Sequence, residues 1–180
     1  LYTYIHHRMG YNYRMTEMQA AIGLKALEKL PANIDARRAN AHYLTGKLAD
    51  YAAFIPPYEH EDYRHSFYKY YVRLDLEQLT VDRDIFVKAV RAEGVPIGLG
   101  TASEGYREKA LQDYIGYGTD GCPFKCPWYG AKVDYANIFM PNAQRLGKEV
   151  FVLQVHPTIQ ETDLQDVVHA LEKVLNAYQK

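Results

Sequence analysis

GYNYRMTEMQAAIGLKALEKL, residues 10–30, places a cluster of aromatic and polar residues directly before a helical pattern. Thr16 and Gln19, three residues later, form a capping box, in which each side chain satisfies a backbone amide of the other residue. Apolar residues then cover a broad helical face, at Met18, Ala21, Ile22, Leu24, Leu27 and Leu30. The sequence therefore predicts a helix that starts at Thr16 and ends at Pro31, but it leaves the cluster at residues 10–14 unexplained.

A second helical pattern follows Pro31. Apolar residues recur about every 3.5 residues, at Ile34, Ala41, Leu44 and Leu48. The two patterns together predict a helical hairpin or a bent pair of helices.

The middle of the chain predicts a strand, a helix and a further strand. Residues 67–74 alternate between two faces, which is the period of a strand. Asp82 is a good N-cap for a helix that Gly94 ends. Residues 95–99, VPIGL, predict a short strand, and Pro96 favours the edge of the sheet.

The last part of the chain begins with a long segment, residues 100–141, rich in glycine, tyrosine and proline. Connections of this length are usually functional or disordered. A strand is predicted from Glu149, in EVFVLQV, and Thr162 with Gln165 predicts the start of a final helix. This order of elements is typical of an α+β domain, with a small sheet covered by helices on one face.

Composition favours small molecules or proteins as partners. The 180 residues carry a formal net charge of −1 without a basic stripe, so nucleic acid and membranes are poor candidates. No apolar run approaches the roughly 18 residues of a membrane span, and no signal peptide is apparent. Two cysteines form no disulfide framework, so we expect a cytoplasmic protein. Because the first residue is Leu1, we also expect a piece of a longer chain.

Few residues indicate chemistry on their own. The chain has no Walker-type phosphate loop and no G-x-S-x-G elbow. Cys122 and Cys126 lack the further ligands that zinc needs, so we expect no metal site and instead a proline-stiffened loop with two packed thiols. His65, before the strand, can meet a substrate hydroxyl or phosphate, or be an ordinary packed or exposed residue. These residues alone indicate an α+β domain and no more.

Several segments resemble one known family. Residues 10–30 resemble the signature that follows the catalytic lysine in the DegT/DnrJ/EryC1/StrS family of pyridoxal-phosphate sugar aminotransferases. Three further segments are similar to the family's later elements, and the resemblance covers nearly all of the chain. These segments are RHSFYKYYVRLDL at 64–76, CPFKCPWYG with MPNAQRL at 122–146, and LQVHPTIQETDLQDVVHALEKV at 153–174.

The resemblance implies a type I pyridoxal-phosphate (PLP) aminotransferase fold, a homodimer, and amino transfer from glutamate or glutamine to a keto-sugar or keto-cyclitol. Such enzymes act in antibiotic, amino-sugar or surface polysaccharide biosynthesis. The resemblance further implies that residues 1–50 form a helical segment linking to a large PLP-binding domain, and that residues 51–180 form a small C-terminal α+β domain. The catalytic lysine would precede Leu1, so we expect no catalytic residue in this segment.

The resemblance also implies three site residues. Asn12 would reach the cofactor phosphate across the dimer, and its amide is a neutral donor suited to that role. Arg14 would meet a substrate anion, with a structural ion pair as the alternative, and His65 would meet the substrate. The family's usual CPVAE pattern reads MPNAQ at residues 140–144. The alternative function is a non-catalytic dimerisation or small-molecule-sensing module derived from this family.

Overall fold

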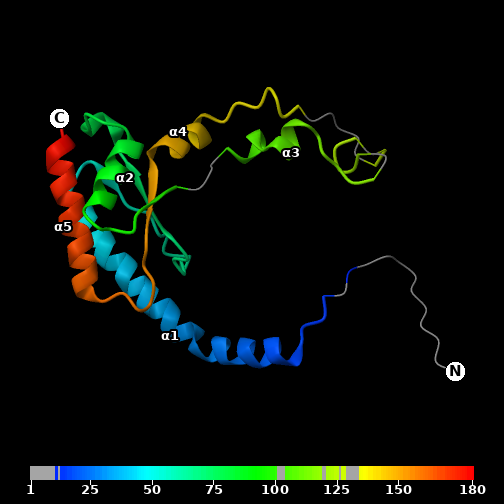
Figure 1. Cartoon of the computed structure of the whole chain (residues 1–180), viewed down its shortest axis with the longest axis horizontal. Helices are drawn as coiled ribbons and strands as arrows, with labels where there is room; N and C mark the ends of the chain where they lie inside the picture. Colours follow the sequence, from blue (N-terminus) through cyan, green and yellow to red (C-terminus); the bar gives the residue numbers. More distant parts are fainter. Residues whose placement is uncertain (1–10, 12, 101–103, 119–120, 126, 129–133) are drawn as a thin grey trace.

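The computed structural model describes residues 11, 13–100, 104–118, 121–125, 127–128 and 134–180. Helices and a small sheet form one body, from which the start of the first helix and a long later segment extend (Figure 1). The elements are α1 (Glu17–Leu48), β1 (Phe54–Ile55), β2 (Tyr70–Leu74), η1 (Leu76–Gln78), α2 (Arg83–Ala92), β3 (Gly98–Leu99), η2 (Gly105–Arg107), α3 (Lys109–Gln112), α4 (Pro141–Glu149), β4 (Val150–Leu153) and α5 (Glu161–Tyr178).

Helix α1 begins as the sequence predicts. The amide of Gln19 donates to Thr16 Oγ1 at 3.3 Å, and the amide of Thr16 donates to Gln19 Oε1 at 3.0 Å, which confirms the capping box. The predicted end at Pro31 is wrong, because Pro31 lies inside one continuous helix. Proline removes one amide donor and crowds the carbonyl four residues earlier, so it bends a helix without having to end it. The helix does change direction along its length (Figure 1).

The sheet is antiparallel with strand order β1-β2-β4-β3. Val72 of β2 lies opposite Phe151 of β4, and Leu99 of β3 lies on the other side of Phe151. Buried and half-buried residues alternate along β2, so one face of this strand packs into the core. The predicted strands near residues 67–74, 95–99 and 149 are confirmed, with β3 at the edge, whereas the two-residue β1 and helix α4 were not predicted.

The ends of α2 and the start of α5 test how well local capping patterns predict helix boundaries. Asp82 caps α2 by accepting from the amide of Ile85 at 2.9 Å, and Gly94 follows the helix with a φ of +91°, as predicted. The predicted start of α5 is wrong by two positions. The amide of Gln160 donates to Asp163 at 2.8 Å, so the first-turn carboxylate of Asp163 fixes the start, and Thr162 lies inside the helix.

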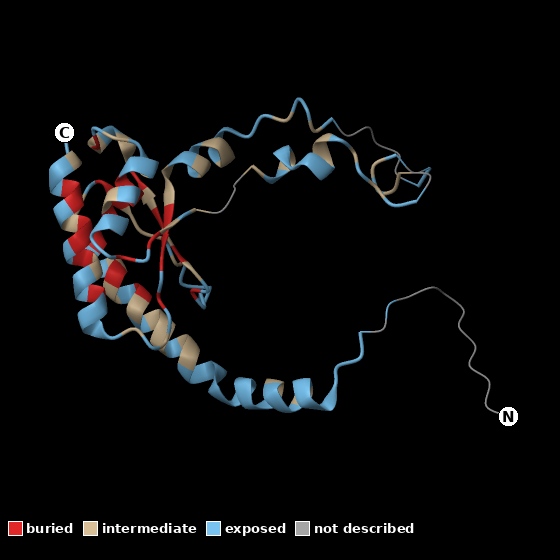
Figure 2. Ribbon diagram, viewed as in Figure 1, coloured by how far each residue is buried: buried red, intermediate tan, exposed pale blue. Residues whose placement is uncertain are grey.

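The core lies where α1, α2 and α5 meet the sheet, as the buried residues in Figure 2 show. Its members from α1 are Ala41, Leu44 and Leu48, so the second half of α1 belongs to the core. The first half does not: Met18 and Ile22 are 76% and 71% exposed. The division of the chain at residue 50 stays a prediction. None of the helices in the described part combines the length and apolar character needed to cross a membrane.

Candidate functional site

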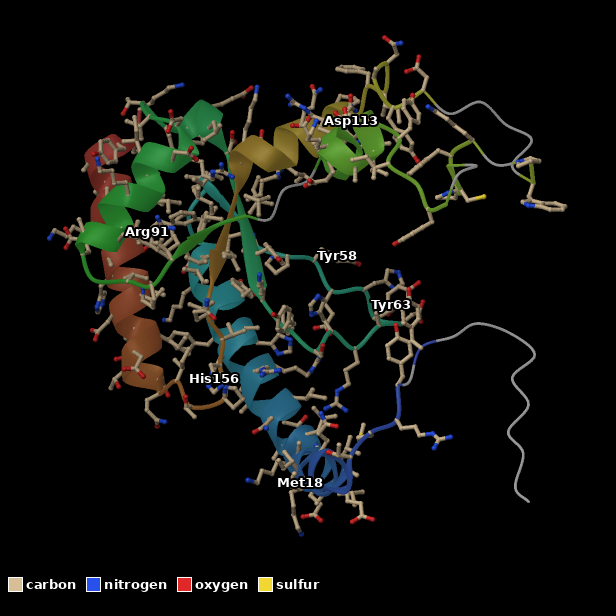
Figure 3. The ribbon with its side chains drawn as sticks, turned by 45° about the vertical axis from the view of Figure 1, so that its right-hand side comes forward. Met18, Tyr58, Tyr63, Arg91, Asp113 and His156 are labelled. Carbon is tan, nitrogen blue, oxygen red and sulfur yellow. The ribbon has the colours of Figure 1, made fainter. Side chains whose placement is uncertain are left out.

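A loop rich in aromatic residues joins β1 to β2. This aromatic loop, residues 56–69, forms no helix or strand of its own. It starts with two prolines and exposes three tyrosines, Tyr58, Tyr63 and Tyr68. Tyr58 and Tyr63 project from the loop on the side away from α5 (Figure 3). Exposed aromatic rings on a loop held by a rigid scaffold are typical of binding sites.

The carboxylate of Glu59 holds this loop against α1. Arg38 donates to it from Nη1 at 2.5 Å and from Nη2 at 3.4 Å, and His42 Nε2 lies 3.1 Å from it. The backbone amide of His65 donates to Glu59 Oε1 at 2.7 Å. The hydrogen bond from Arg38, followed by those from His65 and His42, lowers the pKa of Glu59 from 4.5 to about 2. Glu59 is therefore ionised at neutral pH.

Arg38 and His42 reach Glu59 together because they lie four residues apart on α1, and such residues share one helix face. Sequence reasoning missed Arg38, His42 and Glu59. One signal was available, because residues 59–65 are dense in charged and histidine side chains between two prolines and a strand. That density does not reveal which helix the loop contacts.

The structure treats the three predicted site residues differently. His65 lies in the aromatic loop, directly beside Glu59 and Arg38, since Arg38 also donates to the His65 carbonyl at 2.7 Å. Arg14 is exposed on the stretch before α1, at the end of the helix remote from the sheet (Figure 1). The structure therefore does not bring Arg14 and His65 together within this chain. Asn12 lies outside the described residues.

A shallow hollow lies over the aromatic loop. Its volume is about 470 Å³, and its lining residues are Tyr58, Glu59, His60, Tyr63, Arg64, His65 and Ser66. Arg64 forms an ion pair with Asp35 of α1, and His60 Nδ1 lies 3.4 Å from Asp62. Because Glu59 is matched by Arg38, the carboxylate and the guanidinium of the lining each have a partner of opposite charge. The arrangement therefore suits a ligand that has apolar C–H faces and uncharged polar groups better than a highly charged ligand.

The segment between β3 and α4 carries a second hollow, of about 360 Å³. The Gln112 side chain donates to the carbonyls of Tyr106 and Tyr135, at 2.8 and 3.0 Å. It therefore joins the early part of the segment, near η2, to its late part, before α4. A hydrogen bond from the Tyr106 hydroxyl is the main cause that lowers the pKa of Glu104. The MPNAQRL sequence lies here as the beginning of α4, with Met140 as its N-cap.

The cysteines of this segment remain without an assigned role. The amide of Tyr117 donates to the carbonyl of Cys122 at 2.6 Å, whereas Cys126 lies outside the described residues. Within the described ranges, no group of three or more histidine, cysteine, aspartate or glutamate side chains is arranged to hold a metal ion.

Residues 2–172 match the model of the DegT/DnrJ/EryC1/StrS aminotransferase family. The chain belongs to this family. One relative in it is the spore coat polysaccharide biosynthesis protein SpsC of Bacillus subtilis (strain 168), which is 25% identical over 166 residues. That match covers 92% of this chain and 38% of SpsC. The chain thus spans about 38% of the length of the curated relatives it matches.

Several solved structures share the fold. The aminotransferase from Psychrobacter cryohalolentis is similar with a TM-score of 0.77 and 28% identity, over 98% of this chain and 42% of that chain. The E. coli GDP-4-keto-6-deoxy-D-mannose-3-dehydratase, solved with bound hydrated PLP, is similar with a TM-score of 0.69 and 22% identity, over 90% of this chain and 36% of that chain. These likenesses confirm the predicted fold class, part of a PLP-dependent aminotransferase fold.

Proposed function

We propose that the chain is the C-terminal part of a PLP-dependent aminotransferase that moves an amino group from glutamate or glutamine to a keto-sugar or keto-cyclitol. The family match over residues 2–172 carries this proposal. The role of SpsC in spore coat polysaccharide biosynthesis supports a sugar as the acceptor, in amino-sugar, antibiotic or surface polysaccharide synthesis. The whole protein would act in the cytoplasm as a homodimer.

Residues of this chain would assist the reaction rather than carry its chemistry. PLP, when bound, supplies an electron sink that makes the proton next to the transferred nitrogen removable. We propose Asn12 as a donor to the cofactor phosphate and Arg14 as a partner for a substrate anion. Arg14 fits such a role in charge, because a guanidinium is a planar set of donors that matches an anion. His65 would contact the sugar.

The test is the product of the complete reading frame that contains these 180 residues, purified beside the 180-residue chain. We expect the longer protein to retain PLP on a lysine outside this chain and to aminate a keto-sugar when glutamate or glutamine is supplied. The 180-residue chain alone should do neither. Mass spectrometry after borohydride reduction locates the cofactor, and product analysis distinguishes amination from the loss of water expected of a dehydratase.

Two outcomes would overturn the proposal. A reduced cofactor on a lysine within these 180 residues would place the catalytic group here. A reading frame without a PLP-binding half, with a chain that assembles but binds no PLP, would favour the non-catalytic dimerisation or sensing module instead.

A further inference from the structure

The peptide of His65 is held at both of its polar groups. Its amide donates to Glu59 Oε1 at 2.7 Å, and its carbonyl accepts from Arg38 Nη1 at 2.7 Å. The same Arg38 nitrogen donates to Glu59 at 2.5 Å, so Arg38, Glu59 and the His65 peptide form a closed ring of hydrogen bonds. The side chains of Glu59 and Arg38 are each 20% exposed, so both are held against the surface rather than extended into solvent. The position of His65 is therefore fixed by two residues that lie 21 positions apart.

The imidazole ring of His65 is fixed as well. Its Nδ1 accepts from the amide of Phe67 at 2.8 Å, and its ring lies on the Phe67 ring with the centroids 4.3 Å apart. Phe67 is buried and has a φ of +47°, a backbone conformation that bulky residues rarely adopt. A backbone amide can only donate, so Nδ1 must be the unprotonated nitrogen. The proton of the neutral ring consequently lies on Nε2.

The surroundings of this ring suit an uncharged ligand. His60 lies between the two tyrosines, with its ring centroid 6.2 Å from Tyr58 and 5.7 Å from Tyr63. Both tyrosines are exposed, and Figure 3 shows them on the same loop. Their rings can lie against the C–H groups of a sugar or cyclitol. Among the described residues that line the hollow, the arginine, Arg64, is paired with Asp35, so its guanidinium is already matched by a carboxylate and favours a phosphate less.

We propose that His65 Nε2–H donates to an oxygen of a polyhydroxylated ring bound in this hollow, and that Glu59 and Arg38 are the positioning residues that keep His65 in this state. The proposal rests on the proposed function in one respect only, which is that the bound polyhydroxylated ring is part of the substrate. The positioning itself is a property of the 180-residue chain, so it can be measured without cofactor or turnover.

The first measurement is nitrogen-15 NMR of the histidine rings in the 180-residue chain. We expect His65 to show an unprotonated Nδ1 and a protonated Nε2 at neutral pH. In Glu59→Ala the two nitrogens should move toward a mixture of tautomers, whereas Glu59→Gln, which keeps an acceptor oxygen, should restore the original signals in part. Glu61→Ala, an exposed carboxylate of the same loop, is the matched control and should change nothing. A purely structural Glu59 would alter stability without altering the tautomer.

The second measurement is a titration of the chain with myo-inositol, an uncharged polyhydroxylated ring, and in parallel with inorganic pyrophosphate. We expect the His65 and Tyr63 signals to shift with myo-inositol, and the dissociation constant to rise about tenfold in His65→Phe and in Glu59→Ala, as the loss of one hydrogen bond implies. A response to pyrophosphate alone, or to neither probe, overturns the ligand class. An unchanged tautomer in a folded Glu59→Ala variant overturns the positioning role. Retention of PLP by the longer protein is independent of both results.

Discussion

The hydroxyl of Tyr70, on β2, lies 2.8 Å from the hydroxyl of Thr45, on α1. Tyr70 is fully buried in the core, so Thr45 supplies the polar partner that its hydroxyl would otherwise lack. Burial raises the pKa of Tyr70 to about 12, and the hydrogen bond with Thr45 opposes this shift. This pair adds a polar contact between α1 and the sheet to the apolar packing of the described core.

Replacing Tyr70 by Phe should lower the free energy of unfolding by about 1 kcal/mol, the net value of one hydrogen bond. Thr45→Val should have a similar effect, and the double variant should lose less than the sum of the two because one bond is counted twice. Urea unfolding of the four proteins measures this. Fully additive losses would show that the two hydroxyls do not interact.

The same tyrosine predicts a loss of stability at alkaline pH. Its folded pKa of about 12 lies above the unfolded value of 10, so its neutral form is favoured in the fold. The contribution is complete below pH 10 and is lost as the pH rises from 10 toward 12. Tyr70→Phe should flatten the stability profile in this window. A variant profile as steep as that of the parent would assign the loss to other groups.

Glu59 predicts the opposite behaviour in acid. Its pKa falls from 4.5 to about 2 in the folded chain, so its contribution is present above pH 4.5 and is lost as the pH falls toward 2. Glu59→Gln should therefore show a shallower decline of melting temperature over this range. Glu61→Gln, in the same loop, serves as the control and should keep the decline of the parent.

Two glycines at the sheet edge should resist substitution. A Cβ on Gly100 would lie 2.8 Å from the carbonyl oxygen of Val150, and a Cβ on Gly98 would lie 2.7 Å from a Val152 methyl group. Alanine at either position should cost about 1–3 kcal/mol, with the larger loss at Gly100 because a backbone atom cannot rotate away. Gly46→Ala is the control: it has open space on α1 and should stabilise by about 0.5–1 kcal/mol. Thermal unfolding ranks the three.

Replacing Pro31 by alanine should stabilise helix α1. It is exposed inside α1, and alanine there would restore an amide donor to the carbonyl of Leu27. Proline in a helix interior costs roughly 3 kcal/mol relative to alanine, so Pro31→Ala should raise the temperature at which helical circular dichroism is lost. Lys29→Ala, two positions earlier, should leave it nearly unchanged. A lower helix content in Pro31→Ala would mean that the bend is needed for packing.

The long segment at residues 100–141, whose length is typical of functional or disordered connections, contains a hydrogen-bonded bridge that can be removed. Gln112 joins the carbonyls of Tyr106 and Tyr135 through one side-chain amide. Gln112→Leu should therefore speed amide hydrogen exchange at Tyr135, whose amide bonds to the Tyr114 hydroxyl, while exchange at β2 stays the same. Fast exchange at Tyr135 already in the parent chain would indicate a disordered connection and would contradict the role of Gln112.

Local sequence patterns correctly predicted the features that depend on residues close together in the chain. Thr16 and Gln19 cap α1, and the alternation along β2 matches its buried face, because both effects act over a few residues. Pro31 was misjudged because a bend and an end look the same in sequence. The Glu59 site could not be predicted, because it depends on where the aromatic loop contacts a helix about 20 residues earlier in the chain. The packing of the core fixes that contact, and no local sequence pattern encodes it.

The first half of α1 determines how the chain loses structure on heating. No residue from 17 to 30 is buried, whereas Leu44 and Leu48 tie the second half to the sheet. A helix of fewer than about 12–15 residues is marginal in water without packing. The turns before Pro31 should thus melt gradually, ahead of a sharp transition of the core. Calorimetry of the whole chain would then depart from two-state behaviour, and the melting temperature would describe the core transition alone.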